Sequence, residues 1–479
     1  MSLYIIWACA FLLLYLLWLI SLTIKSWWSK PNTLGDYFLA GKNVGFIPSI
    51  LTFWATYFSA AALIGASGYY YIHGIGNFIF ASMGYCILAV VTGTVGVRLW
   101  KLSRQYPEIR SPIQLYLRSF NSMQLETLFV TVSLLCLIPY MAAQITGFAR
   151  LIESAIGLPY LWTAASAITI IFLYSESGGL KNIIQTDVLQ SLMTIIGCTG
   201  LVISFLWIYW NFDLIRFIED VDALCSPSLL SLPGPEKLYT PTIIISLAVL
   251  ISLGAVPMAH NAQRYMIVRE LKYLKRLMYM FPIMGIFVTF IAMILGLGGA
   301  VHFPGLESGD QVIGRVTAVV PAAIGALATI GIVASTMSTA DSILLSVGFI
   351  VSEQKYRNNH AKDSTRIRSL NRWCIIAVSV FSFFASIRPN LVTELAFNAF
   401  GGMLQLAPVM FAGIYGLRVT NGCAFCSVLG GLIVVALGNT PLYMRLPFST
   451  VPHYFVGFII AILILCLGRL IYRRPLTYS

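Results

Sequence analysis

Charged residues are scarce in this chain. Asp, Glu, Lys and Arg make up 10% of the 479 residues, whereas 58% of the residues are hydrophobic and the mean hydropathy is +0.84. A soluble domain of this length does not have such a composition, so the sequence predicts an all-α integral membrane protein. A single transmembrane domain is expected over residues 1–479, because no stretch has the composition of a soluble catalytic domain.

Motifs for enzymatic chemistry are also missing. The sequence has no phosphate-binding glycine-rich loop that ends in Gly-Lys-Ser/Thr and no serine nucleophile elbow. Its 5 histidines are dispersed without metal-ligand spacing, and its 9 cysteines suggest no disulfide framework. These absences argue against ATP-driven transport and hydrolysis and predict a protein that is not an enzyme.

Thirteen apolar runs are long enough to be membrane spans. They cover approximately residues 3–24, 46–71, 76–100, 124–156, 160–176, 183–210, 241–266, 277–300, 318–352, 373–388, 391–417, 421–440 and 453–472. With an outside N-terminus, the cytoplasmic loops hold 24 of the 30 Lys and Arg residues. The positive-inside rule therefore predicts a multi-pass membrane protein with its N-terminus outside and its C-terminus in the cytoplasm. The net charge of +12 reports this orientation and not nucleic-acid binding.

Two of these runs are predicted to be discontinuous helices. The second contains the stretch Ala55–Ala61, followed by Gly65 and Gly68. In the seventh, Gly254 permits unusual backbone angles and Pro257 removes a backbone donor. Tolerated kinks are the simpler alternative. Because the two runs are five apart, however, the breaks favour an inverted repeat with its binding site at the breaks.

Hydroxyl side chains recur on one helical face of the ninth run. They are Ser335, Ser338, Thr339, Ser342 and Ser346, and Asp341 lies on the flank of this stripe. A carboxylate near the middle of a membrane helix costs about 2.5–3.5 kcal/mol, so it needs a partner. Clustered oxygens suit a small hard cation, although close helix packing explains any single hydroxyl equally well. Asp187 in the sixth run is expected either as a further cation ligand or as a solvated interfacial carboxylate.

Several motifs, taken in order along the chain, resemble the sodium/solute symporter family. They are Asp36–Gly41, Ala55–Ser59, Gly178-Gly179-Leu180 followed by Thr186-Asp187, and Met337-Ser338-Thr339. Within the family the chain is most similar to bacterial sodium/pantothenate permeases, through Ala55–Ala60, Gln144–Leu151, Gly157–Pro159 and Phe400–Gly402. The resemblance implies a LeuT-type fold with two inverted five-helix repeats, at 46–210 and 241–417. It also implies symport of a small organic solute with Na+.

The resemblance further implies two cation sites. The first sodium site would use the carbonyl oxygens of Ala55, Phe58 and Ser335 and the hydroxyls of Ser338 and Thr339. The second would use Asp187, Ser338, Asp341 and Ser342. Asp341 stands where some two-sodium members have Ser, so the ion stoichiometry and the choice between sodium and proton coupling stay open.

The solute is expected to bind near the two breaks. Ser59 and the freed amides after it would attract a carboxylate. Tyr140 and Gln144 in the fourth run, and Pro257 and Met258 at the second break, are the other candidates. Ordinary interhelical hydrogen bonding is the alternative for Tyr140 and Gln144. No Lys or Arg is expected at mid-membrane depth.

These features predict a sodium-coupled importer of a small monocarboxylate such as pantothenate. A sodium- or proton-coupled symporter of an amino acid such as proline is the alternative. A membrane sensor module is less favoured because no output module is visible, and an ion channel is disfavoured by the broken helices. The predicted partners are the solute, the sodium ion and the lipid bilayer, with no nucleic acid and no obligate protein partner.

Overall fold

The structure is a computed structural model that describes residues 3–28, 34–175, 179–359, 364–387, 391–438, 440–446 and 449–471. Gly178, quoted above in a family motif, lies outside these residues. Within them every regular element is a helix, and one isolated parallel bridge joins Val44 to Val268. The protein is therefore all-helical over its described length, as the composition predicts.

Eight helical segments among the described residues are long and apolar enough to cross a membrane. They are α1 (Leu3–Trp28), the continuous α5 (Gly76–Val91), η3 (Thr92–Gly96) and α6 (Val97–Gln105), then α8 (Met123–Ile156), α10 (Gly179–Trp210), α14 (Leu271–His302), α16 (Ala322–Asn359), α17 (Ser364–Ile387) and α22 (His453–Ile471). Large apolar side chains such as Leu13, Ile283 and Leu467 are exposed on them. Such surfaces are suited to lipid, because the bilayer core accepts apolar side chains and helices satisfy their own backbone groups.

Broken helices add further spans. α3 (Phe46–Tyr57) is bent by 59° from η2 (Ala61–Gly65) and α4 (Ala66–His73), and α18 (Val392–Leu404) is bent by 45° from α19 (Ala407–Tyr415). α12 (Pro241–Leu253) is separated from α13 (Ala259–Ile267) by the turn at 254–258. The helices are thus discontinuous at the two predicted places. The third break, before Pro408 in the first turn of α19, was not predicted.

The number of spans stays a prediction. Counting each bent pair as one span gives up to 10 among the described residues. Three shorter apolar helices lie at other predicted spans: Tyr160–Ile171 within α9 (Tyr160–Ser175), α12, and α20 (Asn421–Leu437). The boundaries of the two repeats, at 46–210 and 241–417, are likewise still predictions.

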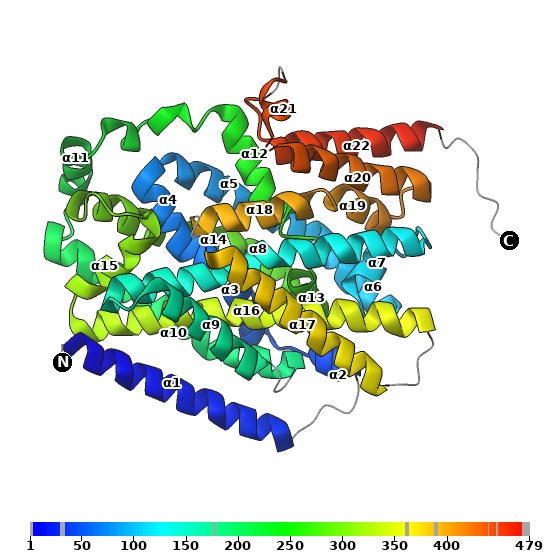
Figure 1. Ribbon diagram of the computed structural model, residues 1–479, viewed down its shortest axis with the longest axis horizontal. Helices are drawn as coiled ribbons and strands as arrows, with labels where there is room; N and C mark the ends of the chain where they lie inside the picture. The colour runs from blue at the N-terminus through cyan, green and yellow to red at the C-terminus, as the bar shows by residue number, and fades with distance from the viewer. Residues whose placement is uncertain are drawn as a thin grey trace.

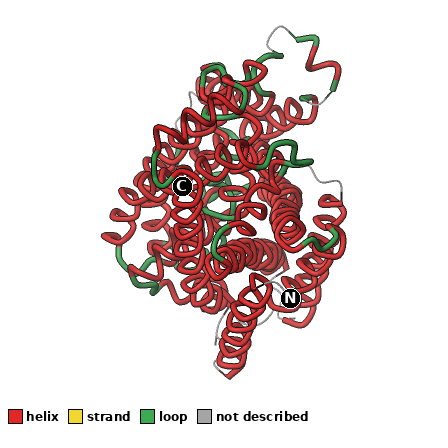
Figure 2. Tube along the Cα trace, turned by 90° about the vertical axis from the view of Figure 1, so that its left-hand side faces the viewer, coloured by secondary structure: helices red, strands yellow, loops and turns green. Residues whose placement is uncertain are grey.

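The remaining elements connect these helices at the two ends of the bundle. They are α2 (Leu34–Leu39), η1 (Ala40–Lys42), α7 (Pro112–Tyr116), α11 (Leu214–Leu224), η4 (Pro227–Leu230), η5 (Pro235–Lys237), η6 (Gly309–Gln311), α15 (Val312–Val319) and α21 (Pro441–Met444). Figure 1 places α11 and α15 at one end and α6 and α7 toward the other. Figure 2 shows the same bundle from one end, with helices surrounding its centre.

The centre of the bundle is built around α10 and α16, which pack along one another. Thr194 on α10 donates to the Gly331 carbonyl of α16 at 2.7 Å. α1 packs on the same helix, where the hydroxyl oxygens of Tyr4 and Thr329 are 2.7 Å apart. This packing sets the register that brings the first turns of α10, around Asp187, against the hydroxyl stripe of α16.

Gly254 has a different role from the predicted one. Its backbone is ordinary right-handed helix (φ −67°, ψ −29°), so unusual backbone angles do not require glycine there. A Cβ atom at this position would instead lie 2.7 Å from the carbonyl oxygen of Phe400. Glycine is needed because α18 passes very close to the end of α12.

Candidate ion and solute sites

The break after α3 leaves backbone carbonyl groups without helical partners. α3 ends at Tyr57, and Phe58 has non-helical backbone angles (φ −107°, ψ 74°). The last carbonyl groups of a helix have no intrahelical donors. Here Ser335 Oγ donates to the Phe58 carbonyl at 2.7 Å, and Thr339 Oγ1 donates to the Ala55 carbonyl at 3.0 Å. The break is therefore held against α16 by two hydroxyl groups one turn apart.

These groups form a buried set of oxygens, here called the α3–α16 site. It consists of the carbonyls of Ala55 and Phe58 and the hydroxyls of Ser335, Ser338 and Thr339, from residues at most 2% exposed. The predicted set used the Ser335 carbonyl, but the Ser335 hydroxyl is the group that reaches Phe58. Uncharged oxygens of this kind suit a hard cation, which would replace the hydroxyl-to-carbonyl hydrogen bonds.

Asp187 on α10 lies beside this site and is fully buried. Its carboxylate accepts hydrogen bonds from Thr52 Oγ1 and from Ser338 Oγ. Ser338 thereby links Asp187 to the α3–α16 site. Of the two positions considered for Asp187, the structure excludes the solvated one.

A buried arginine completes the surroundings of Asp187. Arg264 on α13 is 0% exposed, and its Nη2 lies 3.2 Å from Asp187 Oδ2. The same nitrogen donates to Ser342 Oγ at 2.6 Å, while Nε donates to Thr56 Oγ1 at 2.9 Å. A guanidinium keeps its charge in proteins, so this is a buried ion pair. Arg264 joins α13 to α3, α10 and α16.

The sequence reasoning expected no Lys or Arg at mid-membrane depth and did not anticipate that Arg264 is buried inside the bundle. The sequence reasoning put this residue at the very end of the apolar run 241–266 and counted it with the basic residues of the cytoplasmic loop that follows. The structure instead buries every residue of α13, because the turn at 254–258 sends this short helix into the bundle. Asp187 was the signal that could have found Arg264, since a carboxylate within a span needs a cationic partner.

Asp341 does not join the hydrogen-bonded set. Its side chain is 1% exposed, and neither carboxylate oxygen has a hydrogen-bond partner among the described residues. On α16 it lies one turn after Ser338 and directly before Ser342, so it is close to the ion pair without touching it. Of the four residues predicted for the second cation site, Asp187 bonds to Ser338, Ser342 bonds to Arg264, and Asp341 stays apart.

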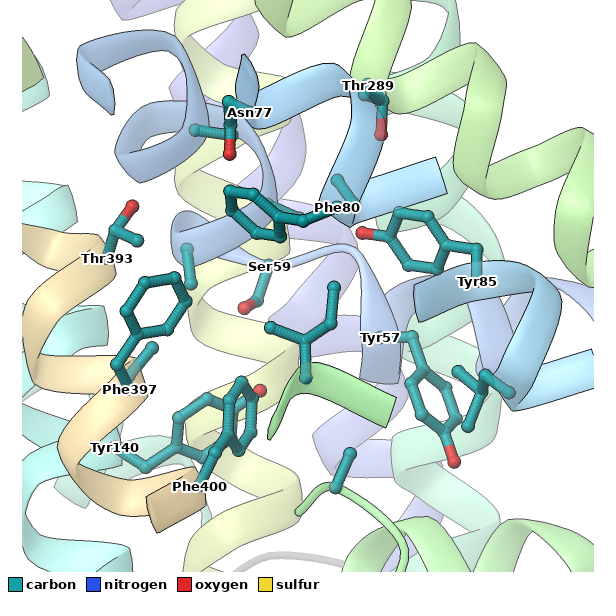
Figure 3. Close-up of a pocket in the computed structure, with 18 of the residues that line it drawn as sticks. Tyr57, Ser59, Asn77, Phe80, Tyr85, Tyr140, Thr289, Thr393, Phe397 and Phe400 are labelled. Carbon is teal, nitrogen blue, oxygen red and sulfur yellow. The ribbon is translucent and has the colours of Figure 1, made fainter. Parts of the chain in front are cut away.

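A cavity of about 90 Å³ lies on the other side of the α3–α4 break. Its walls carry aromatic rings and a few polar groups, and no Asp, Glu, Lys or Arg lies among the described residues that line it. Figure 3 shows the rings of Phe80, Tyr85, Tyr140, Phe397 and Phe400 around Ser59. Pockets of this kind hold small molecules by apolar contact and orient them with a few polar groups.

Ser59 and Tyr140 are the predicted solute residues that line this cavity. Gln144 is fully buried behind them: its Oε1 accepts from the Ala60 amide at 3.4 Å, and its Nε2 donates to Ser59 Oγ at 3.5 Å. The first freed amide of the break is therefore already bonded to Gln144. It is not available to a solute carboxylate as the sequence suggested.

The α12–α13 break reaches the cavity through residues that were not predicted. Ala255 and Asn261 line the cavity, whereas Pro257 and Met258 do not. Met258 is 0% exposed, and its carbonyl accepts from the Ala262 amide at 3.1 Å, so Met258 packs in the core at the start of α13. Asn261 Nδ2 donates to the Ala255 carbonyl at 2.7 Å, which folds the start of α13 back over the break.

Three polar atoms at the cavity have no hydrogen-bond partner among the described residues: Asn77 Nδ2, Asn261 Oδ1 and Thr393 Oγ1. A buried polar group left unbonded costs about 1–3 kcal/mol, so these residues of the cavity wall have bonding capacity that a small shift of their side chains would offer to a ligand. The cavity is more polar than the sequence suggested. Asn77 on α5 and Thr393 on α18 come from the third and eleventh predicted spans, in which the sequence reasoning assigned no particular polar residue to the solute.

Discontinuous helices around a buried set of oxygens and an adjoining cavity are typical of secondary membrane transporters. A model of the sodium:solute symporter family matches residues 37–431, which is most of the chain. The chain belongs to this family, and it is a multi-pass membrane transporter and not an enzyme. The predicted family membership is confirmed.

Two curated relatives carry a more specific description. The chain is 24% identical to the sodium/pantothenate symporter of Escherichia coli (strain K12), over 86% of both chains. It is also 24% identical to the sodium/pantothenate symporter of Haemophilus influenzae (strain ATCC 51907 / DSM 11121 / KW20 / Rd), over 84% of both chains.

Solved structures of other transporters share the fold. A Na+-coupled sialic acid symporter aligns over 99% of both chains with a TM-score of 0.78 and 17% identity. MHP1, a nucleobase-cation-symport-1 family transporter, aligns over 92% of this chain and 96% of its own with a TM-score of 0.57 and 14% identity. MhsT aligns over 88% of this chain and 98% of its own, with a TM-score of 0.55 and 14% identity. The predicted LeuT-type fold is thus confirmed.

Proposed function

We propose that this transporter couples sodium entry at the α3–α16 site to the import of pantothenate or a closely similar monocarboxylate. The observation that carries sodium coupling is the convergence of the Ala55 and Phe58 carbonyls with hydroxyls of Ser335 and Thr339 at a helix break. A cation bound there would contact both sides of the break through α3 and α16. Occupation of the site would therefore stabilise one arrangement of the broken helix over others.

The solute assignment is supported by the cavity and by the two relatives. Pantothenate is a monocarboxylate with an amide and two hydroxyl groups, and the cavity offers both donors and acceptors to such a molecule. Asn261 Oδ1 accepts, Asn77 Nδ2 donates, and the hydroxyls of Ser59 and Thr393 do either. The aromatic rings would cover the apolar body of the solute.

Uptake in sealed vesicles tests the proposed solute. Purified protein in proteoliposomes should accumulate radiolabelled pantothenate above its outside concentration when sodium is high outside. It should not do so when potassium replaces sodium, or when a proton gradient alone is applied. Unlabelled pantothenate should compete, whereas the pantothenate methyl ester, proline and galactose should not. Competition by proline alone would show that the solute is an amino acid. Competition by galactose alone would refute the proposal that the solute is a monocarboxylate.

Orientation is tested separately by cysteine labelling of intact cells. We propose an outside N-terminus and a cytoplasmic C-terminus, from the distribution of basic residues in the loops. A membrane-impermeant maleimide should label a cysteine introduced at Asp222, which is exposed on α11. It should not label a cysteine at Lys275, near the start of α14, until the membrane is permeabilised. The reverse pattern would overturn the proposed orientation.

A further inference from the structure

The place expected for a second cation is already held by a positive side chain. The guanidinium of Arg264 donates from Nη2 to both Asp187 Oδ2, at 3.2 Å, and Ser342 Oγ, at 2.6 Å. Asp187 and Ser342 are two of the four side chains that the family resemblance assigns to a second ion. The hydroxyl of a third, Ser338, donates a hydrogen bond to Asp187. The residues present therefore fit a guanidinium at this position better than a second sodium ion.

The charges of the buried cluster can be counted. The acidic and guanidinium side chains among the described residues of this cluster are Asp187, Arg264 and Asp341, each at most 1% exposed. With both carboxylates ionised, the guanidinium balances one of them and a single negative charge remains. An unbalanced buried carboxylate is costly, so it must either bind a proton or be balanced by one further cation nearby. A sodium ion in the adjoining α3–α16 site supplies that charge, and a second sodium ion would leave an excess positive charge.

We propose that Arg264 is a tethered cation that takes the place of a second ion, so that each protein molecule binds one sodium ion, at the α3–α16 site. This inference rests on the sodium coupling proposed above. It assigns distinct roles to the two carboxylates. Asp187 is the permanent partner of Arg264, and Asp341 is the source of the negative charge that the sodium ion balances.

Displacement of Arg264 by sodium is disfavoured by the contacts that the guanidinium makes. The Nε of Arg264 is bonded to Thr56 on α3, and the whole of α13 around it is buried. The guanidinium has no exposed position to which it could move without a rearrangement of α13. A sodium ion at Asp187 would therefore place two positive charges side by side in a fully buried position.

Equilibrium dialysis with radioactive ²²Na+ measures the number of sodium ions bound per chain. It uses the purified full-length protein in detergent micelles and requires neither solute nor transport. The parent protein should bind one ion per chain. Arg264→Gln should bind two, because both carboxylates then need a mobile cation. Asp187→Asn combined with Arg264→Gln should return the count to one, and this double variant avoids a lone buried charge that would impair folding. Arg269→Gln, in an exposed pair with Glu270, is the matched control and should also bind one.

A readout of affinity separates a tethered cation from a purely structural ion pair. Asp341→Asn should raise the sodium concentration for half-saturation at least tenfold, since it removes the charge that the ion balances. Two ions bound by the parent, or one ion bound by Arg264→Gln with the parent affinity, would overturn the inference. No sodium bound by the parent would contradict the proposed sodium coupling itself, so the two failures are distinguishable.

Discussion

Two regions of this molecule bury a carboxylate completely, and they compensate it in different ways. At the centre of the bundle, Asp187 faces the guanidinium of Arg264 and two hydroxyl donors. Toward the end that carries α15, Asp310 in η6 has no ion pair with any described residue, and its Oδ2 accepts from the Val392 amide at the start of α18, at 2.8 Å. The central carboxylate is thus held by a full opposite charge, whereas Asp310 is held by a helix N-terminus.

Because their compensation differs, the two carboxylates should respond differently to mutation and to pH. In a buried ion pair each charge is already balanced by its partner. Removal of one partner leaves the other charge buried without compensation and strongly destabilises the protein. A buried carboxyl without a cation can instead be stabilised by binding a proton. The region around Asp310 is also held by close backbone packing, since a Cβ atom on Gly309 would lie 2.5 Å from the carbonyl oxygen of Gly68.

The largest expected effect is the loss of the central ion pair. Asp187→Ala leaves Arg264 buried without its counter-ion and should lower the free energy of unfolding by about 3–5 kcal/mol. Denaturant unfolding in detergent micelles measures this change. Asp187→Ala combined with Arg264→Ala should lose less than Asp187→Ala alone. A loss of under about 1 kcal/mol in the single variant would show that Arg264 has found another partner and that the comparison is wrong.

The second prediction concerns Asp310 and pH. Burial raises the pKa of its carboxyl from 3.8 to about 7. The negative charge of Glu394 raises this pKa further, whereas the hydrogen bond from the Val392 amide and the positive charge of Arg150 lower it. A raised pKa means that the folded protein holds the proton more tightly than the unfolded chain does. The stabilisation from this group is complete below the unfolded pKa and is lost as pH rises through about 7.

The unfolding temperature in detergent should therefore fall from pH 5 to pH 8 more steeply in the parent than in Asp310→Asn. Across this interval the parent should lose more free energy of unfolding than Asp310→Asn, by on the order of 2 kcal/mol. The asparagine keeps an oxygen that can accept from Val392, so the variant removes only the titration. Asp222→Asn, which changes an exposed carboxyl on α11, is the control and should keep the parent's pH profile. Equal slopes in the parent and in Asp310→Asn would refute the prediction.

Sequence reasoning anticipated the parts of this molecule that depend on local patterns. The apolar runs predicted the helices, and the small residues around Ser59 and the Gly254-x-x-Pro257 sequence marked two of the breaks. The hydroxyl stripe of Ser335 to Thr339 was found from helical periodicity. Each of these follows from residues close together in the chain, where spacing fixes which side chains share a face.

The parts that escaped the sequence depend on how distant segments meet. Arg264 has the surroundings of a loop residue in the sequence, and only the turn of α13 into the bundle buries it. Asn77 and Thr393 reach the cavity from α5 and α18, and hydropathy does not reveal which face of a buried helix meets a cavity. The break between α18 and α19 does have a local signal, because Pro408 cannot bond to the carbonyl of Leu404 at the end of α18, but the sequence reasoning did not use it.

A smaller effect is expected from the close packing near Asp310. Gly68→Ala would place a Cβ atom 2.6 Å from Asp310 Oδ1 and 2.8 Å from the Asp310 amide nitrogen. Such overpacking against backbone costs about 1–3 kcal/mol, which should appear as a lower unfolding temperature. Gly422→Ala is the matched control, because a Cβ atom there meets nothing within 4 Å. An unchanged unfolding temperature in Gly68→Ala would mean that η6 and α4 separate at little cost.

The smallest predicted change concerns sodium binding at the α3–α16 site, beside the ion pair. Ser338→Ala and Thr339→Ala should each raise the sodium concentration for half-maximal uptake by about tenfold, or about 1.4 kcal/mol, because each removes one ligand from a desolvated ion. Sodium titration of solute uptake in proteoliposomes measures the change.

Thr336→Ala provides the control for these two variants. Thr336 is equally buried on α16, but its hydroxyl bonds to the Val333 carbonyl of its own helix at 2.7 Å and not to the break. Its removal should leave the sodium dependence unchanged. If Ser338→Ala and Thr339→Ala behave like Thr336→Ala, the ion does not bind at the α3–α16 site. If Ser338→Ala has the larger effect of the two, the additional loss reflects its second role, since Ser338 alone of the two also donates to Asp187 and connects the sodium site to the ion pair.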